Sequence, residues 1–440
     1  MAEPENSTAA GRVAFRYPSF VLFQTARFSI VLANEMQSVA VGWQVYEITK
    51  RPLDLGLVGL AQFLPGILLF LVSGHVADRY DRRKLIVCCY VGFAVCWGLL
   101  LLSTGRSVRS VYYIFAVLIL FGVVRSFTGP VSRALLPQLV PEEHFPNAVA
   151  WASTTFQGAA ILGPALGGIV YALFRGPTAV YVLAVILAIV AVLCTMQIKT
   201  QAKPRSREPI NLTTVSAGLR YIWREKLILG SISLDLFAVF LGGAVALLPV
   251  YAREVLLTGP WGLGLLRTAP GVGAAAMAIF LAHRPIRRKV GLIMLWCVAG
   301  FGLFTILFGL SHSLILSLVA LFFVGATDMV SVIVRAVLIQ VATPDEMRGR
   351  VNAVDMVFIG ASNEFGEFES GLTAQWFGTV PAVVLGGIGT LIVTAIWAWR
   401  FPELRNVEQI HALPRTAVTV PELPTSEVSA EQRSRRWKPR

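Results

Sequence analysis

Residues 74–84 read Gly-His-Val-Ala-Asp-Arg-Tyr-Asp-Arg-Arg-Lys, and between positions 78 and 84 only Tyr80 is uncharged. An apolar run over 57–72 precedes this stretch, and another over 85–102 follows it. A short charged turn between two long apolar segments is typical of a membrane hairpin whose turn lies in water. Retention of basic residues on the cytoplasmic side would explain the charge, but it would not require Gly74, Asp78 or their spacing.

The composition places the chain among integral membrane proteins. Of its 440 residues, 55% are hydrophobic and 14% are charged, whereas soluble domains carry about 25% charged residues. Twelve apolar segments, each about 20 residues or longer, follow one another, and only helices can supply so many spans. The sequence therefore predicts an all-α integral membrane protein with twelve transmembrane helices. The segments begin near Phe20, Leu55, Leu85, Val111, Ala148, Ala179, Leu227, Gly262, Val290, Leu314, Val351 and Ala382.

The net charge of +13 would point to a nucleic-acid partner in a soluble domain. Here most lysines and arginines lie in the connections after segments 2, 6, 8 and 10, on one side of the membrane, so we exclude nucleic acid as a partner. The excess of positive charge places these connections and both termini in the cytoplasm. We expect a multi-pass protein of the bacterial inner (plasma) membrane.

The longest connection divides the segments six and six. We expect two pseudo-symmetric six-helix bundles, because a linker over 199–226 separates them and carries a short amphipathic helix over 212–223. The tail is polar and rich in Pro, Glu and Arg, which predicts disorder. The expected units are a cytoplasmic segment 1–17, a first bundle 18–198, the linker 199–226, a second bundle 227–400 and a disordered cytoplasmic tail 401–440.

The two halves of the chain repeat one another at a separation of 202 to 205 residues. Parallel repeats of six helices predict a pseudo-two-fold axis along the membrane normal and a binding site at the midplane between the halves. The matching pairs include Val45-Tyr46 with Val250-Tyr251, Gly59-Leu60 with Gly264-Leu265, Arg82-Arg83-Lys84 with Arg287-Arg288-Lys289, Arg133 with Arg335, and Gly168 with Gly371.

Charged residues inside the predicted spans are the candidate functional residues. Each costs about 2.5–3.5 kcal/mol at the bilayer centre, so it should face a partner or a cavity. Arg125 cannot lose its charge and needs an acidic partner or a path to water, and Glu35 of another helix in the same half is a suitable partner. The residues expected to act in substrate binding or proton coupling are Glu35, Arg125, Asp235, Asp328, Glu364 and Glu367.

The span near residue 364 carries three carboxylates. Glu364 and Glu367 are three residues apart and share a helix face, whereas Glu369 points elsewhere. One interpretation is a bent span whose outer part lines water, so that the acids are merely solvated. The other is that Glu364 and Glu367 line the central cavity and bind protons or cationic or polar groups of a substrate.

Residues 158–168 form a run of small residues that contains Gly163, Pro164, Gly167 and Gly168. Small residues permit close approach between helices, and a proline kinks its helix. Ordinary tight packing is the alternative interpretation of this run.

The sequence offers no support for enzymatic activity. It contains no Ser/His/Asp set, HExxH motif, Walker loop or Cys-x-x-Cys pair, and no histidine has a second metal ligand at helical spacing. All five cysteines fall inside apolar segments, where small buried hydrophobic residues are expected. We expect neither a metal nor a cofactor.

The stretch at 74–84 resembles the major facilitator superfamily signature between spans 2 and 3, Gly-x-Leu-Ala-Asp-Arg-x-Gly-Arg-Arg-Lys. Val76 replaces the leucine, and Asp81 replaces a glycine, so an aspartate must make the tight turn. The run Gly163–Gly168 is similar to the span-5 signature of the antiporter (exporter) branch. The resemblance covers residues 16–400. Residues 80–84, 248–253 and 363–371 are most similar to the branch that contains the bacterial enterobactin exporter.

The resemblance implies a secondary transporter that works by alternating access as a single chain. It would export a siderophore, a drug or another amphiphilic organic solute against proton entry, with the solute, protons and the lipid bilayer as its partners. A lipid or lysolipid flippase and a non-transporting scaffold or receptor of the same fold are the alternatives.

We also expect a conformational gate around the opening stretch. A carboxylate at position 78 would be favourable at the N-terminus of the span-11 helix near Arg350, where it would hold the two halves together on the cytoplasmic side. The gate residues are Gly74, Asp78, Arg79, Arg82 and Arg83.

Overall fold

The computed structural model describes residues 13–104, 110–199 and 212–408, without the side chains of Phe70, Leu71, Asp78 and 212–215. These ranges contain helices and no strand. Nine of the helices in this described part are long and apolar enough to cross a membrane. All twelve predicted apolar segments are helical there, which confirms the predicted fold class.

The first half of the chain folds into six spans. The second span is divided in two, because the helix that contains Pro65 ends at Leu68 and a new helix begins at Phe70. The helices are α2 (Pro18–Thr49), α3 (Pro52–Leu68), α4 (Phe70–Arg79), α5 (Arg82–Leu102), α6 (Val111–Leu135), α7 (Phe145–Leu173) and α8 (Thr178–Met196).

The second half contains the other six spans, and its first span is also irregular. Two glycines, Gly242 and Gly243, end one helix in mid-span, and 3₁₀ and π turns continue the path. The elements are α10 (Lys226–Leu241), η5 (Ala244–Leu247), α11 (Leu248–Val250), η6 (Tyr251–Val255), α12 (Gly259–His283), α13 (Val290–Leu310), α14 (Leu314–Ala342), α15 (Asp345–Phe377) and α16 (Thr379–Arg400).

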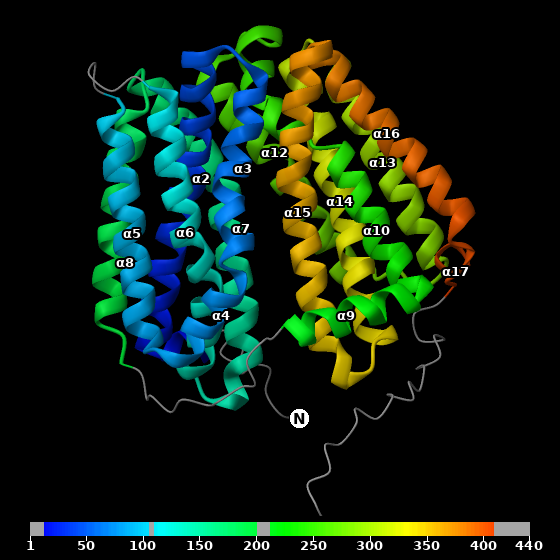
Figure 1. The fold of residues 1–440 in the computed structure, drawn as a ribbon, viewed down its shortest axis with the longest axis horizontal. Coiled ribbons are helices and arrows are strands. Elements are labelled where there is room, and N and C mark those ends of the chain that lie inside the picture. Colours follow the sequence, from blue (N-terminus) through cyan, green and yellow to red (C-terminus); the bar gives the residue numbers. More distant parts are fainter. Residues whose placement is uncertain (1–12, 105–109, 200–211, 409–440) are drawn as a thin grey trace, which may run out of the picture.

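The two halves lie side by side, with α4 and α9 (Leu212–Arg224) at one end and the α2–α3 turn at the other (Figure 1). We call the first the basic end, because it carries residues 79–84, and the second the opposite end. The ribbons of the two halves approach each other at the opposite end and diverge toward the basic end (Figure 1). The halves meet mainly where α7 packs on α12 and where α3 packs on α15.

Glycines allow both of these helix pairs to cross closely. A Cβ atom on Gly168 would lie 2.8 Å from Cα of Gly264, and one on Gly371 would lie 3.2 Å from Cα of Gly56. Any side chain at these positions would push backbones apart, as is usual where small residues line a membrane helix interface. Gly168 and Gly371 are equivalent positions of the repeat, so the two crossings are symmetric counterparts.

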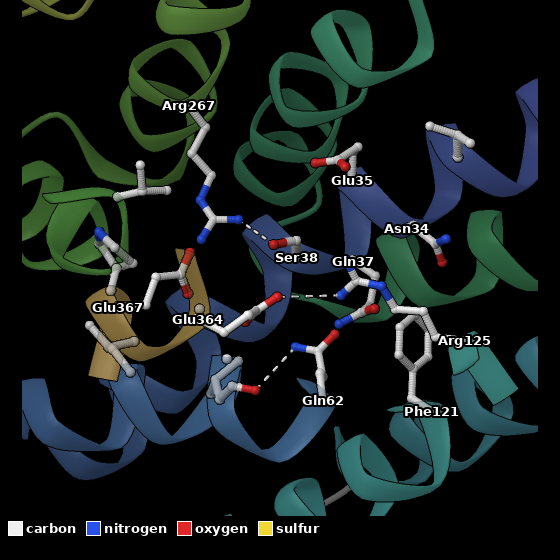
Figure 2. Close-up of a pocket in the computed structure, with 18 of the residues that line it drawn as sticks. Asn34, Glu35, Gln37, Ser38, Gln62, Phe121, Arg125, Arg267, Glu364 and Glu367 are labelled. Atoms are coloured by element: carbon white, nitrogen blue, oxygen red, sulfur yellow. Dashed lines mark hydrogen bonds and ion pairs between the residues drawn. The ribbon is translucent and has the colours of Figure 1, made fainter. Parts of the chain in front are cut away.

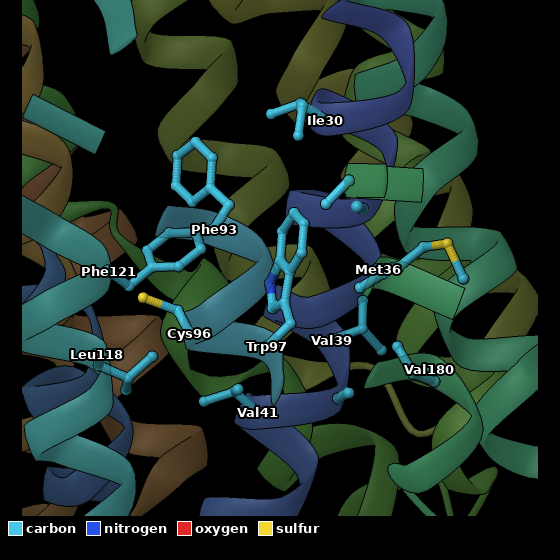
Figure 3. Close-up of a cluster of buried hydrophobic side chains, with 14 of the residues drawn as sticks. Ile30, Met36, Val39, Val41, Phe93, Cys96, Trp97, Leu118, Phe121 and Val180 are labelled. Atoms are coloured by element: carbon cyan, nitrogen blue, oxygen red, sulfur yellow. The ribbon is translucent and has the colours of Figure 1, made fainter. Parts of the chain in front are cut away.

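Aromatic packing forms the core of the first half. The ring of Phe93 stacks on Trp97 at 5.7 Å and lies 4.9 Å from the ring of Phe121. All three side chains are buried and lie between α5, α6 and α2 (Figure 3). This core holds α6, which carries Arg125, against α2, which carries Glu35.

The second half has hydrophobic core clusters of its own, and it also contains a buried ion cluster. The guanidinium of Arg335 on α14 pairs with Asp235 on α10, and its Nε lies 3.5 Å from a carboxylate oxygen of Asp355 on α15. The side chains of Arg335 and Asp235 are only 3% and 8% exposed. Asp328 lies about two turns before Arg335 on α14, near enough for its charge to interact with those of Arg335 and Asp235.

Two short helices pack against the second half at the basic end. The predicted amphipathic helix is present as α9 (Leu212–Arg224), and its Tyr221 hydroxyl donates to the carbonyl of Ala342 at 3.1 Å. The start of the tail differs from the disorder expected over 401–440. Residues Pro402–Arg405 form α17, Leu404 is buried, and the carbonyl of Val407 accepts a hydrogen bond from the amide of Gly291. Residues 409–440 lie outside the described residues.

The ion cluster predicts a large effect of Arg335 on stability. Arg335→Ala would leave the carboxylate of Asp235 buried without its cation, and breaking a buried pair in this way costs about 3–5 kcal/mol. We expect a clearly lower Tm for the purified variant in detergent. The matched control is Lys226→Ala, which removes an exposed pair with Glu403 and should cost less than about 1 kcal/mol. Equal Tm values for the two variants would contradict this role.

Candidate functional site

A cavity of about 340 Å³ lies between the two halves. The first half lines it from α2, α3, α6 and α7, and the second half from η5, α11, α12 and α15 (Figure 2). Its lining is unusually polar for the middle of a membrane protein, and aromatic rings of Phe121 and Phe156 lie among the polar groups. Of the predicted site residues, it contains Glu35, Arg125, Glu364 and Glu367.

One ion pair in the cavity joins the two halves. A guanidinium nitrogen of Arg125 on α6 lies 3.8 Å from a carboxylate oxygen of Glu364 on α15, and the two side chains point toward each other (Figure 2). The Arg125 side chain is 57% exposed, whereas that of Glu364 is 16% exposed. The expected acidic partner of Arg125 is therefore not Glu35 in its own half, but a carboxylate of the other half.

Glu364 and Glu367 converge on the same point of α3. A Cβ atom on Gly59 would lie 2.9 Å from Oε2 of Glu364 and 2.8 Å from Oε2 of Glu367. The absence of a side chain at Gly59 is therefore what leaves room for both carboxylates. Two neighbouring buried carboxylates do not both stay charged without a proton or a cation to share. This pair is suited to hold a proton.

Glu35 is held by the glycine run of α7. A Cβ atom on Gly163 would lie 2.3 Å from Cβ of Glu35, and one on Gly167 would lie 2.8 Å from Cα of Met36. The run therefore lets α7 pack directly on α2, while its last glycine, Gly168, packs on α12. Pro164 lies inside α7 and faces α12, because its carbonyl oxygen would lie 2.6 Å from a Cβ atom on Gly264.

Arg267 is a site residue that the sequence analysis missed. It extends from α12 into the cavity and donates a hydrogen bond to the hydroxyl of Ser38 on α2, so it is a second polar link between the halves (Figure 2). The signal was available, since Arg267 lies inside an apolar segment and the criterion that selected Arg125 also selects it.

Several polar atoms around the cavity have no hydrogen-bond partner among the described residues. They are Nε2 of Gln37, Oδ1 of Asn34 and Nε of Arg267, and all three are buried. Gln37 is 1% exposed and lines the cavity. Buried polar groups normally find partners, so these atoms are available to a bound solute or to water.

The structure does not bring Asp235 and Asp328 to this cavity. Both belong to the ion cluster around Arg335 inside the second half, and neither is among the residues that line the cavity. Asp355, which the sequence analysis also missed, is part of the same cluster. The six predicted site residues therefore divide into four that line the cavity and two, Asp235 and Asp328, that belong to the ion cluster.

The opening stretch ties helices of the first half together. Arg82 donates to the carbonyl of Ala134 in the last turn of α6 at 3.2 Å, and Arg83 donates to the carbonyl of Met196 at the end of α8. Basic side chains at helix C-termini bind free carbonyls and complement the helix dipole. The described part of the stretch thus joins the start of α5 to the ends of α6 and α8 within the first half.

Two expectations for this stretch need correction or stay open. Asp81 belongs to the two-residue connection between α4 and α5, but it does not adopt the left-handed backbone that favours glycine, since its φ and ψ are −60° and 113°; its carboxylate caps α5 by accepting from the amides of Arg83 and Lys84. At Gly74 a Cβ would meet open space, so close packing does not require this glycine. Arg79 is exposed in the last turn of α4. The side chain of Asp78 lies outside the described residues, and Arg350 contacts Gly218 of α9.

The chain is similar in sequence to bacterial exporters. It is 26% identical over 401 residues to the enterobactin exporter EntS of Shigella boydii serotype 4 (strain Sb227), and this alignment covers 89% of the chain and 94% of the relative. Identity and coverage are the same for EntS of Escherichia coli (strain K12). A family model described as transmembrane secretion effector matches residues 10–434.

Solved structures with the same fold are transporters. A D-xylose–proton symporter superposes with a TM-score of 0.66 at 16% identity, over 88% of this chain and 98% of the other. A bacterial homologue of the human lysosomal transporter Spinster, in an inward-facing and occupied conformation, gives 0.67 at 13% identity with the same coverage. The chain therefore belongs to the transmembrane secretion effector family, and it is a multi-pass membrane transporter of the major facilitator superfamily rather than an enzyme.

Proposed function

We propose that this chain is a proton-coupled exporter that moves an amphiphilic organic solute, such as a siderophore or a drug, out of the cell. The relatives named as enterobactin exporters support a siderophore as the first solute to test. The proposal places the basic end and both termini in the cytoplasm, and it requires only one chain, because the cavity is built within it.

The observation that carries the proposal is the carboxylate pair Glu364 and Glu367 opposite Gly59. Both carboxylates lie in the cavity and belong to one half, and Arg125, which pairs with Glu364, belongs to the other. A group that binds there therefore affects how the halves are held together. Neither carboxylate belongs to the ion cluster around Arg335 that joins α10, α14 and α15 within the second half.

Export against proton entry requires that solute and proton compete for one site. Ionised Glu364 and Glu367 accept hydrogen bonds from N–H, O–H or cationic groups of the solute, in place of Arg125. Protonation removes this acceptor and so releases the solute. On the outside, where the proton concentration is higher, the proton therefore displaces the solute; on the inside, the proton leaves and solute binds again.

The other cavity groups would set what fits. Phe121 and Phe156 offer apolar faces to a ring, and the unpaired amide atoms of Asn34 and Gln37 offer one acceptor and one donor. The preferred solute would then combine aromatic or apolar parts with several hydrogen-bonding groups. A scaffold without transport activity would have no use for unpaired polar atoms and a shared carboxylate pair at this depth, where they are costly.

Uptake into inverted membrane vesicles tests the proposal. Enterobactin and the cationic dye ethidium are offered to vesicles whose interior is acidified, and uptake above that of vesicles without the protein is measured. We expect uptake of at least one of them, which stops when the pH gradient is collapsed. Uptake of neither, together with movement of labelled lysophosphatidylethanolamine without a gradient, would replace the proposal with lysolipid flipping.

Neutralising Glu364 should uncouple solute transport from the proton gradient. Glu364→Gln keeps the shape of the side chain but cannot release a proton, and a hydrogen bond to a charged group is worth about tenfold or more in an equilibrium. We expect proton-driven uptake to fall by about that factor. Glu369→Gln is the control, because Glu369 lies on the same helix, accepts from Thr373 at 2.6 Å and does not line the cavity. Equal proton-driven uptake by both variants would refute the role of Glu364.

Gly59 should be intolerant of even a methyl group. In Gly59→Ala the new Cβ lies under 3.0 Å from both carboxylates, so it must displace them, and we expect uptake to fall about as far as in Glu364→Gln. Gly66→Ala is the control on the same helix, since a Cβ there meets nothing within 4 Å. Alanine at position 66 should retain transport and leave the Tm unchanged or raised, because alanine stabilises a helix by about 0.5–1 kcal/mol over glycine. Normal uptake by Gly59→Ala would show that the carboxylates do not need this space.

A further inference from the structure

We propose that Trp43, Tyr46, Arg253 and Glu254 form an outer latch. These four residues hold the two halves together at the opposite end, and the latch must open each time the cavity faces outward. The latch residues are positioning residues for transport, and none of them lines the cavity. Their assignment to the outer side of the membrane rests on the orientation in the proposed function.

The latch is the last part of a single stripe of contacts along α2. Ser38, Gly42 and Tyr46 are spaced by four residues and so share one face of the helix. Each meets a different element of the second half: Ser38 accepts from Arg267 on α12, Gly42 faces Pro249 on α11, and Tyr46 bonds to η6. The stripe runs about 12 Å from the cavity to the end of α2.

The polar contacts of the latch cross from one half to the other. The Tyr46 hydroxyl donates to a carboxylate oxygen of Glu254. The guanidinium carbon of Arg253 lies 5.6 Å from the centre of the Trp43 ring, within the range of a cation–π contact. Nη1 of Arg253 is buried and has no hydrogen-bond partner among the described residues, so the Trp43 ring contributes to compensating this charge.

The backbone of η6 explains how two adjacent residues can both face α2. Residues Tyr251–Val255 form a π turn, which shifts side-chain directions relative to a regular helix and is often found at functional positions. The chain then reverses at Leu257, which has a positive φ of 53°. This irregular turn brings Arg253 to Trp43 and Glu254 to Tyr46.

Within the first half, Tyr171 on α7 contacts the part of α2 that carries Trp43 and Tyr46. The Tyr171 hydroxyl on α7 donates to Glu47 at 3.2 Å, and the Tyr171 ring lies 6.4 Å from Trp43. These contacts join α7 to α2 and do not cross to the second half. Tyr171→Phe removes only the hydrogen bond to Glu47 within the first half and keeps the ring beside Trp43, which makes this variant a matched control.

Thiol labelling of a cavity reporter measures the latch directly. Val245 lines the cavity and is 42% exposed. Val245→Cys is introduced into the full chain with Cys88, Cys89, Cys96, Cys194 and Cys297 replaced by serine. A membrane-impermeant maleimide is then added to intact cells and, separately, to inverted vesicles. The reporter needs no transport, so its result is independent of the solute and of proton coupling.

We expect Tyr46→Phe and Glu254→Ala to raise labelling from outside about fivefold to tenfold, since each removes a hydrogen bond to a charged group at a partly exposed site. Glu254→Gln keeps an acceptor for the Tyr46 hydroxyl, so its labelling from outside should stay close to that of the parent protein. Tyr171→Phe should leave labelling unchanged.

Unchanged labelling in Tyr46→Phe and Glu254→Ala, at parental Tm and expression, would overturn the latch. Equal increases in Tyr171→Phe would also overturn it, because they would show general loosening of this end. An increase seen only in inverted vesicles would retain the latch and reverse the proposed orientation.

Discussion

A charge inside the bilayer needs a partner, and in this protein the cavity carboxylate of Glu364 pairs with a cation of the other half of the molecule. Arg125 on α6 and Glu364 on α15 meet at 3.8 Å only because the halves approach closely. That approach depends on glycines, which let α7 cross α12 and α3 cross α15 almost backbone to backbone. The ion pair, the cavity around it and the contacts on α2 are all consequences of this close crossing.

The same constraint is satisfied in two different ways within one chain. Around Arg335, three carboxylates and one guanidinium share one half, and removing a member would leave an uncompensated buried charge. In the central cavity the charges are divided between the halves, and Arg125 remains largely exposed. A cluster within one half can persist while the halves move, whereas a pair divided between them must be exchanged for another partner when they separate. On this difference we base the proposal of a structural role for Asp235 and a transport role for Glu364.

Sequence alone predicts the fold because hydropathy, basic connections and internal repeats are local or one-dimensional signals. The twelve spans, the helix over 212–224 and four of the six charged candidates at the cavity follow from them. Sequence could not tell that Arg125 meets Glu364 rather than Glu35, since partner choice depends on which helices cross. Gly59 was visible only as a repeat position, because its importance lies in the space that it leaves for side chains 305 and 308 residues later. Asp235 and Asp328 met the same criterion as Glu364, since a buried charge looks alike in sequence whether it is structural or functional.

Competition between solute and proton at Glu364 and Glu367 is tested most directly by proton release on binding. Purified protein in weakly buffered detergent solution is mixed with enterobactin while a pH-sensitive dye reports free protons. Proton release on solute binding that is lost in Glu364→Gln and retained in Glu369→Gln is the predicted result. Binding of the solute with proton uptake, or with no change in free protons at any pH near the midpoint of transport, would contradict the competition.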